Sequence, residues 1–67
     1  MIVLTINGET RSFPAPLNAD QLIRQLELAG KRVALERNGE IVPRSRYGDT
    51  ALADGDALEI VVAVGGG

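Results

Sequence analysis

Residues 57–67 read ALEIVVAVGGG, and this stretch decides the fold of the chain. The part before the glycines predicts a strand over residues 57–64. Both faces of that strand are apolar, which is typical of a strand in the middle of a sheet. We therefore place it parallel to the first strand of the chain, reached by a right-handed crossover. We expect its core-facing residues to be Leu58, Ile60, Val62 and Val64.

The three glycines Gly65, Gly66 and Gly67 follow this strand directly and form the strongest candidate site. Glycine has no Cβ and accepts almost any backbone angle, so this segment can form a thread without side chains. Fully extended, it reaches roughly 10 Å beyond the folded body. We expect a mobile tail at residues 65–67 that presents the terminal carboxylate to a narrow slot in a partner enzyme.

Two Asn-Gly pairs further upstream predict two β-hairpins. A type I′ turn needs positive φ at both central residues, and Asn-Gly is the pair that favours it most strongly. The pairs are Asn7-Gly8 and Asn38-Gly39. They predict four strands, at residues 1–6, 9–13, 33–37 and 40–42.

A helix is predicted between the two hairpins. Asn18 can cap its start, and Gln21 stands three residues later, where it can bond back to the cap. Gly30 is positioned to end the helix in the left-handed conformation. Spacing at the helical period predicts an apolar stripe made of Ala19, Leu22, Ile23, Leu26 and Ala29.

After the second hairpin, the chain is expected to be irregular before its final strand. Residues 44–53 are polar and predict one short helical or 3₁₀ turn around Tyr47. The sequence Asp54-Gly55-Asp56 predicts a tight turn. Two carboxylates in such a turn are too few to enclose a metal ion, so loop chemistry explains them better.

The predicted order is hairpin, helix, hairpin and final strand, which indicates an α+β fold. One short helix covers one face of a mixed four- to five-stranded sheet, the arrangement called the β-grasp or ubiquitin-like fold. Residues 1–67 are expected to form this single domain. The other face has no helix to cover it, so Val3, Val61 and Ala63, with Ala34, are expected to form an exposed docking patch. β-propensity alone would also place such residues there.

Composition argues against several classes of function. The 67 residues include no cysteine and no histidine, which removes thiolate sites, the commonest general base and the commonest metal ligand. The net charge is −2, and acidic and basic side chains are interspersed along the chain. No basic stripe therefore indicates nucleic-acid binding. No apolar run approaches the ~20 residues that span a membrane, and no signal peptide is evident. We expect a cytoplasmic protein that is not an enzyme and binds no metal or cofactor.

Taken together, these motifs resemble the sulfur carrier proteins of thiamine biosynthesis, the ThiS family. The resemblance covers essentially the whole chain, from the opening strand with Asn7-Gly8 to the closing glycines. The segment Asn38-Gly39-Glu40-Ile41-Val42-Pro43-Arg44 and the short length favour this family, whereas a terminal Gly-Gly marks only the superfamily. Gly65 is an addition to the bare Gly-Gly ending.

The resemblance implies that the reactive group is the C-terminal carboxylate of Gly67. In the family, an E1-like adenylyltransferase of the ThiF type activates this carboxylate with ATP and Mg²⁺. A sulfur-donating enzyme then gives a thiocarboxylate, and a thiazole synthase of the ThiG type takes the sulfur into the thiazole ring. By the same resemblance, Gly66 fits the partner's slot and Gly65 extends the thread.

Related functions and a trivial explanation remain open. A terminal Gly-Gly also occurs in the small subunits of molybdopterin synthase and in ubiquitin-like protein modifiers. The short length and the segment Ile41-Val42-Pro43-Arg44 argue against the molybdopterin member. The single lysine, Lys31, argues against self-chaining of a modifier but not against its conjugation to other proteins. The glycines could also be a frayed or artificial end, because glycine-rich ends are commonly disordered.

Overall fold

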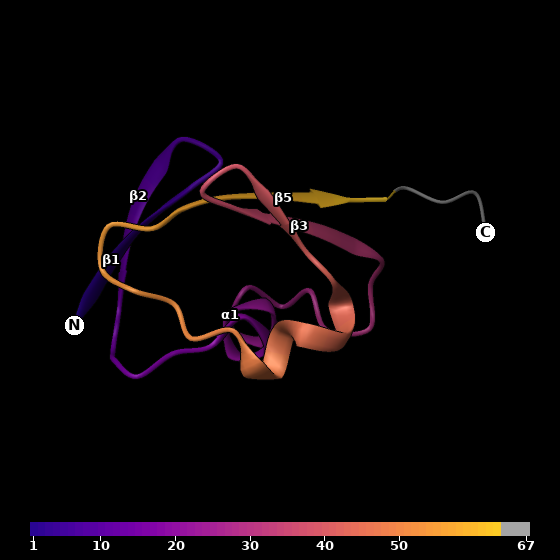
Figure 1. Ribbon diagram of the computed structural model, residues 1–67, viewed down its shortest axis with the longest axis horizontal. Coiled ribbons are helices and arrows are strands. Elements are labelled where there is room, and N and C mark those ends of the chain that lie inside the picture. Colours follow the sequence, from indigo (N-terminus) through magenta and orange to yellow (C-terminus); the bar gives the residue numbers. More distant parts are fainter. Residues whose placement is uncertain (64–67) are drawn as a thin grey trace.

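Five strands form one mixed sheet, and a short helix with a 3₁₀ turn forms the second layer (Figure 1). This is a computed structural model that describes residues 1–63. The strand order across the sheet is β2-β1-β5-β3-β4. In chain order, the elements are β1 (Ile2–Ile6), β2 (Glu9–Phe13), α1 (Ala19–Gln25), β3 (Val33–Arg37), β4 (Glu40–Val42), the 3₁₀ turn η1 (Arg44–Asp49) and β5 (Ala57–Val62).

The strand β5 lies in the centre of the sheet, as its two apolar faces predict. It runs parallel to β1, with Thr5 opposite Ala57, and antiparallel to β3, with Ala34 opposite Val61. The strand ends earlier than expected, at Val62, and residue 64 lies outside the described residues. The predicted β-grasp topology is therefore confirmed, with five strands.

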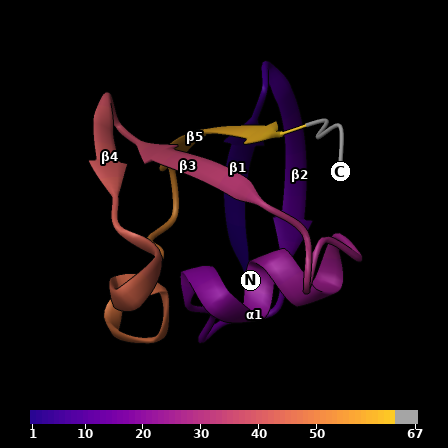
Figure 2. The same cartoon turned by 90° about the vertical axis from the view of Figure 1, so that its right-hand side faces the viewer.

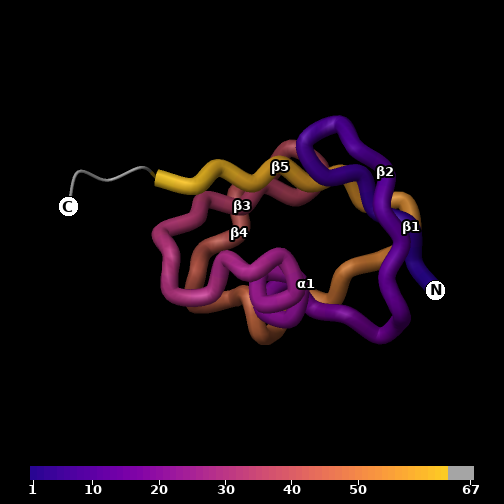
Figure 3. Tube along the Cα trace, turned by 180° about the vertical axis from the view of Figure 1, so that it is seen from behind, coloured from indigo at the N-terminus to yellow at the C-terminus, as the bar shows by residue number. Residues whose placement is uncertain are grey.

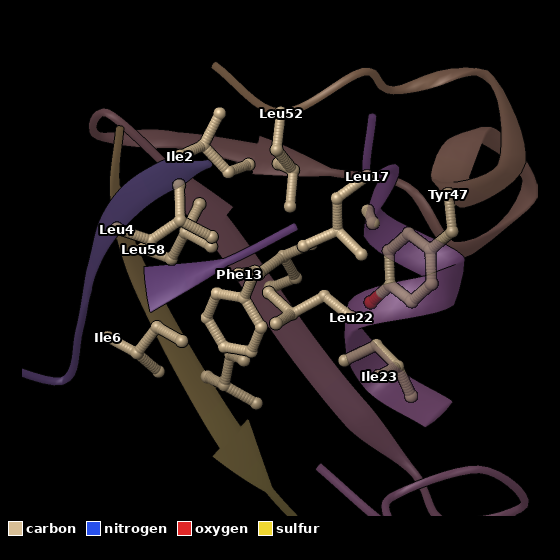
Figure 4. Close-up of a cluster of buried hydrophobic side chains, with 13 residues drawn as sticks. Ile2, Leu4, Ile6, Phe13, Leu17, Leu22, Ile23, Tyr47, Leu52 and Leu58 are labelled. Carbon is tan, nitrogen blue, oxygen red and sulfur yellow. The ribbon is translucent and has the colours of Figure 1, made fainter. Parts of the chain in front are cut away.

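The helix α1 and the turn η1 lie on one side of the sheet and enclose the core (Figure 2). Seen from behind, the other side of β3 and β5 has no helix over it within residues 1–63 (Figure 3). Leu4, Leu22 and Leu35 are completely buried between the two layers. The buried cluster that joins the layers (Figure 4) consists of Ile2, Leu4, Ile6, Phe13, Leu17, Ala19, Leu22, Ile23, Leu35, Tyr47, Leu52, Leu58 and Ile60.

Val62 departs from the expected inward face of β5. Leu58 and Ile60 are buried as predicted, whereas 38% of Val62 remains exposed. The helix ends before it reaches this part of the sheet, and the partly buried Leu26 and Leu28 line a groove beside Val62. The core therefore thins out toward the end of β5.

Both Asn-Gly pairs form the predicted tight turns. The φ angles are 51° and 85° at Asn7 and Gly8, and 52° and 86° at Asn38 and Gly39. Positive φ at both central residues is characteristic of a type I′ turn, whose twist matches that of the flanking strands. The turns join β1 to β2 and β3 to β4 in antiparallel register.

The start of α1 follows the predicted capping box. The Asn18 Oδ1 atom accepts a hydrogen bond from the N–H of Gln21 at 2.8 Å. In return, the Gln21 Oε1 atom accepts one from the N–H of Asn18 at 2.9 Å. The first N–H groups of a helix have no acceptor within the helix, and these two hydrogen bonds satisfy two N–H groups at the start of α1.

The end of α1 comes earlier than expected, at Gln25. Glu27 takes the left-handed conformation, with φ of 61°. The N–H of Glu27 donates to the O of Arg24, and the N–H of Leu28 to the O of Ile23, both at 3.0 Å. These two bonds form the Schellman pattern, in which an apolar residue follows the left-handed one and returns to the core. Leu28 does so, because it packs against the buried cluster.

Gly30 was expected to end the helix, and this prediction is wrong. Its φ of 84° is left-handed as predicted, but Gly30 belongs to the next turn, in which the N–H of Lys31 donates to the O of Leu28 at 3.0 Å. The early helix end brings Leu28 to the core and leaves Ala29 exposed, so Ala29 is not part of the apolar stripe.

Candidate functional site

The candidate site begins at the end of β5, shortly before the glycines at residues 65–67. At the end of β5, the N–H of Ala63 donates to the O of Arg32 at 2.9 Å, so the chain is attached to the segment before β3 up to this residue. Gly65, Gly66 and Gly67 lie outside the described residues. The mobile tail therefore stays a prediction, and the described site is the surface around the end of β5.

On its other side, β5 is held by the side chain of Asn7. The strand β1 ends at Ile6, and the Asn7 amide continues its ladder. The Asn7 Oδ1 atom accepts from the N–H of Ile60 at 2.8 Å, and Nδ2 donates to the O of Ile60 at 3.0 Å. The backbone N–H of Asn7 donates to the O of Leu58 at 2.9 Å. Asn7 therefore forms the turn, and its side chain also makes the two hydrogen bonds to β5 that a further residue of β1 would make.

Asn38, in the other hairpin turn, binds the start of β5. Its Oδ1 atom accepts from the N–H of Ala57 at 2.9 Å, and its backbone N–H donates to the O of Ala57 at 2.7 Å. Sequence reasoning assigned Asn7 and Asn38 to turns alone. The signal that could have shown the second role is the use of Asn rather than Asp in both turns, because only an amide can both donate and accept.

Asp56 is a buried carboxylate that joins the turn before β5 to the second hairpin. Its Oδ2 atom accepts from Arg37 Nε and from the N–H of Ala53, both at 2.8 Å, and its Oδ1 atom accepts from Asn38 Nδ2 at 3.1 Å. Burial by itself raises the pKa of this carboxyl, but these hydrogen bonds and the Arg37 charge outweigh burial and lower the pKa. The predicted turn is confirmed, and the structural role of Asp56 within it is new.

The expected docking patch divides into two surfaces, because Ala34 lies opposite Val61 whereas Val3 lies apart from both. Val61 and Ala63 are exposed on the uncovered side of β5, and Val61 is 63% exposed. Val3 is exposed on the same side of the sheet, but it lies toward the opposite end, because Thr5 stands opposite Ala57. The rise per strand residue separates Val3 from Val61 by roughly 20 Å along the strands.

Ile41 is a further exposed apolar residue that sequence reasoning missed. It is 65% exposed and lies on β4 opposite Glu36, which in turn lies opposite Glu59 of β5. Alternation along β4 could have indicated it, because the neighbouring Val42 packs against the core. We refer to Ala34, Val61 and Ala63 together as the open-face patch, and Ile41 lies outside it, beyond Glu36.

Residues 1–63 also bear on metal and membrane binding. In this part of the chain, no group of three or more His, Cys, Asp or Glu side chains could hold a metal ion. No helix within it is long and apolar enough to cross a membrane. Tyr47 is buried, and burial raises the pKa of its hydroxyl while the Arg44 charge opposes that rise.

Sequence comparisons find relatives over almost the whole chain. The model of the ThiS family matches residues 4–67. The sulfur carrier protein ThiS of Bacillus subtilis is 38% identical over 66 residues, which cover 97% of this chain and 100% of that protein. A thiazole synthase of Paramagnetospirillum magneticum is 50% identical over 64 residues, which cover 96% of this chain. The chain spans only 20% of the length of that thiazole synthase.

A solved structure shares the arrangement described above. It is the crystal structure of a thiamine biosynthesis protein (ThiS) from Geobacter metallireducens, which superposes with a TM-score of 0.82 at 35% sequence identity. The superposition covers 98% of this chain and 100% of that one. Sequence and fold therefore point to the same group of proteins.

Proposed function

The chain belongs to the ThiS family, and on that premise we propose that it carries sulfur for thiamine biosynthesis. The observation that carries this proposal is the extent of the family match, which continues through the glycines to residue 67. A match to the β-grasp body alone would support only the fold, because one fold serves many functions. The similar protein of Bacillus subtilis, matched over its full length, is named a sulfur carrier.

The proposed reactive group is the carboxylate of Gly67, the residue to which the family match extends. A carboxylate is a poor electrophile, so an E1-like adenylyltransferase of the ThiF type activates it. A carboxylate oxygen attacks the α-phosphorus of Mg²⁺-bound ATP, which forms an acyl-adenylate and releases pyrophosphate. A sulfide equivalent from a sulfur-donating enzyme displaces AMP and gives the thiocarboxylate. A thiazole synthase of the ThiG type then takes up this sulfur.

The described body supports this role by fixing the chain just before its glycines. Ile60 is bonded to the Asn7 side chain, and Ala63 is bonded to Arg32. After Ala63, only Val64 has a side chain before the thread of glycines at 65–67. A thread without Cβ atoms can enter a slot that would exclude any other residue, while the body stays outside.

Partner binding is assigned to surfaces near the end of β5. A stretch similar to this whole chain occurs within a protein named thiazole synthase, which supports such an enzyme as the sulfur acceptor. We assign docking to the open-face patch, because exposed apolar groups on an uncovered sheet favour a protein contact. Val3 belongs to a separate surface. ATP and Mg²⁺ are used by the activating partner, and we place the pathway in the cytoplasm.

The proposal is tested by isotope exchange between pyrophosphate and ATP, catalysed by the ThiF-type enzyme. We expect the full chain to support exchange, because the adenylate forms reversibly. A synthetic chain that ends in a Gly67 carboxamide keeps the length of the tail but has no carboxylate, so it should support none. Both forms should have the same thermal midpoint. Equal exchange with the carboxamide, or none with the full chain, would refute the proposal.

A further inference from the structure

The backbone of β5 has an open hydrogen-bonding edge at Val62. Successive residues of a strand direct their N–H and C=O groups to opposite neighbours. Ala57 and Ala63 bond toward the β3 side, through Asn38 and Arg32, and Leu58 bonds toward the β1 side. By this alternation, Val62 directs its N–H and C=O to the β1 side.

No strand pairs with Val62 on that side within the described residues. The β1–β5 register consists of Thr5 with Ala57 and Ile6 with Leu58. The Asn7 side chain adds one further position by bonding both backbone groups of Ile60. The chain then turns away into β2, so the ladder ends one step before Val62.

An apolar groove adjoins this open edge on the helix side of the sheet. It has a volume of about 270 Å³, and Asn7, Glu9 and Arg11 contribute polar groups to its wall. The early end of α1 creates the groove, because the helix does not extend over the last residues of β5. The apolar lining consists of Ile6, Leu26, Leu28, Ile60 and Val62.

The two outer edges of the sheet differ from this one. Proteins protect exposed strand edges with short strands, prolines and charges. The strand β4 has three residues and is followed by Pro43, and β2 carries Glu9 and Arg11. Residues 61–63, at the end of β5, are all apolar, and the charges beside this edge are those of Glu9 and Arg11 in the groove wall.

We propose that an extended strand of the ThiF-type adenylyltransferase, which receives the glycine tail, pairs with Val62. Its backbone bonds to the N–H and C=O of Val62, and one apolar side chain enters the adjoining groove. Strand addition of this kind combines main-chain hydrogen bonds with a side-chain pocket. The occupant follows from continuity, because Val62 lies just before the thread that this enzyme must hold. The inference therefore rests on the proposed function.

The direct test removes the N–H of Val62 and leaves every side chain unchanged. In a synthetic chain, an ester replaces the amide between Val61 and Val62. Loss of one hydrogen bond should weaken binding to the ThiF-type enzyme about tenfold by calorimetry. Because this N–H has no partner within residues 1–63, stability should fall only through the weaker ester carbonyl of Val61, which faces β3. The matched control is an ester between Ile60 and Val61. The N–H of Val61 points to the β3 side, opposite Ala34, so this ester should lower stability and leave affinity unchanged.

Amide hydrogen exchange gives a second readout that needs no variant. The N–H of Val62 should exchange fast in the free chain and be protected at least about tenfold in the complex. Equal affinity of the Val62 ester and the parent chain, or an unprotected Val62 in the complex, would overturn strand pairing. Protection that instead rises with the concentration of the free chain would assign the edge to a second copy and overturn it too. Pyrophosphate exchange, measured with a saturating concentration of the ThiF-type enzyme, tests the proposed function independently of this strand pairing.

Discussion

The Asp56 carboxylate brings three segments of the chain together through one charge. Its side chain is 9% exposed and that of Arg37 is 32% exposed, so the pair is partly shielded from water. Asn38 and Ala53 supply the remaining hydrogen bonds. Hydrogen bonds to a charged group stabilise a protein more than neutral ones, and their loss leaves the partners unsatisfied. Asp56 therefore fixes the position of β5 relative to the second hairpin.

The variant Asp56→Asn should lose about 2 kcal/mol of unfolding free energy at neutral pH. The pKa of Asp56 is lower in the folded state than its unfolded value of about 3.9, so its contribution is present above roughly pH 4 and is lost as pH falls through the folded pKa. Urea unfolding at a series of pH values should therefore show the two proteins converging in acid. The exposed Asp49→Asn is the control. A constant difference down to pH 2 would contradict this role.

Asn7 combines a backbone role and a side-chain role at one position. Its positive φ suits the type I′ turn, and its amide bonds to both backbone groups of Ile60. The two roles can be separated, because glycine keeps the turn conformation but has no amide. A change to glycine therefore isolates the contribution of the side chain.

The variant Asn7→Gly should fold with the same topology and lose about 1–2 kcal/mol of unfolding free energy. The amide of Ile60 should then exchange with solvent faster than in the parent chain, since its acceptor is gone. Denaturant unfolding and hydrogen exchange measure these two effects. Unchanged protection of the Ile60 amide would show that the side chain does not complete the ladder.

At the scale of elements, the helix α1 is short because its end is specified by Leu28 rather than by a glycine. Glu27 occupies the left-handed position of the Schellman pattern, where L-residues are strained by roughly 1–2 kcal/mol. Gly30 lies in the following turn, with no atom near its missing Cβ. The return of Leu28 to the core compensates for the strain at Glu27.

The variant Glu27→Gly should therefore raise the unfolding free energy by about 0.5–1 kcal/mol, which is the strain relieved minus the backbone entropy that glycine adds. Gly30→Ala should lower it, because alanine does not tolerate the φ of 84°. Thermal and urea unfolding of Glu27→Gly and Gly30→Ala measure these two changes in unfolding free energy. If Glu27→Gly destabilised the chain, the assignment of the helix end would be wrong.

Local patterns predicted most elements, and tertiary contacts decided the remainder. The Asn-Gly turns, the capping box at Asn18 and the central position of β5 follow from residue spacing. The end of α1 does not follow from residue spacing. Gly30 is the stronger local signal for a helix end, whereas Leu28 ends the helix by packing against the core, which spacing does not reveal. The separation of Val3 from Val61 depends on the β1–β5 register, which no single segment encodes.

At the scale of the whole molecule, the hydrogen bonds of the body extend to Ala63, shortly before the glycines of the sequence. The body places the open-face patch and the edge at Val62 close to the point where residues 64–67 begin. The chain contains no cysteine, so sulfur added to it cannot be held as a persulfide on a side chain. We propose that the transferable sulfur resides at the terminal carbonyl of Gly67, which is the central claim.

The measurement that tests this claim most directly is the intact mass of the chain after incubation with the ThiF-type enzyme, a sulfur donor and Mg²⁺-ATP. The account predicts a species in which sulfur replaces one oxygen, located by fragmentation at Gly67 and absent when ATP is omitted. An unchanged mass under conditions that support pyrophosphate exchange, or sulfur located at any other residue, would contradict it.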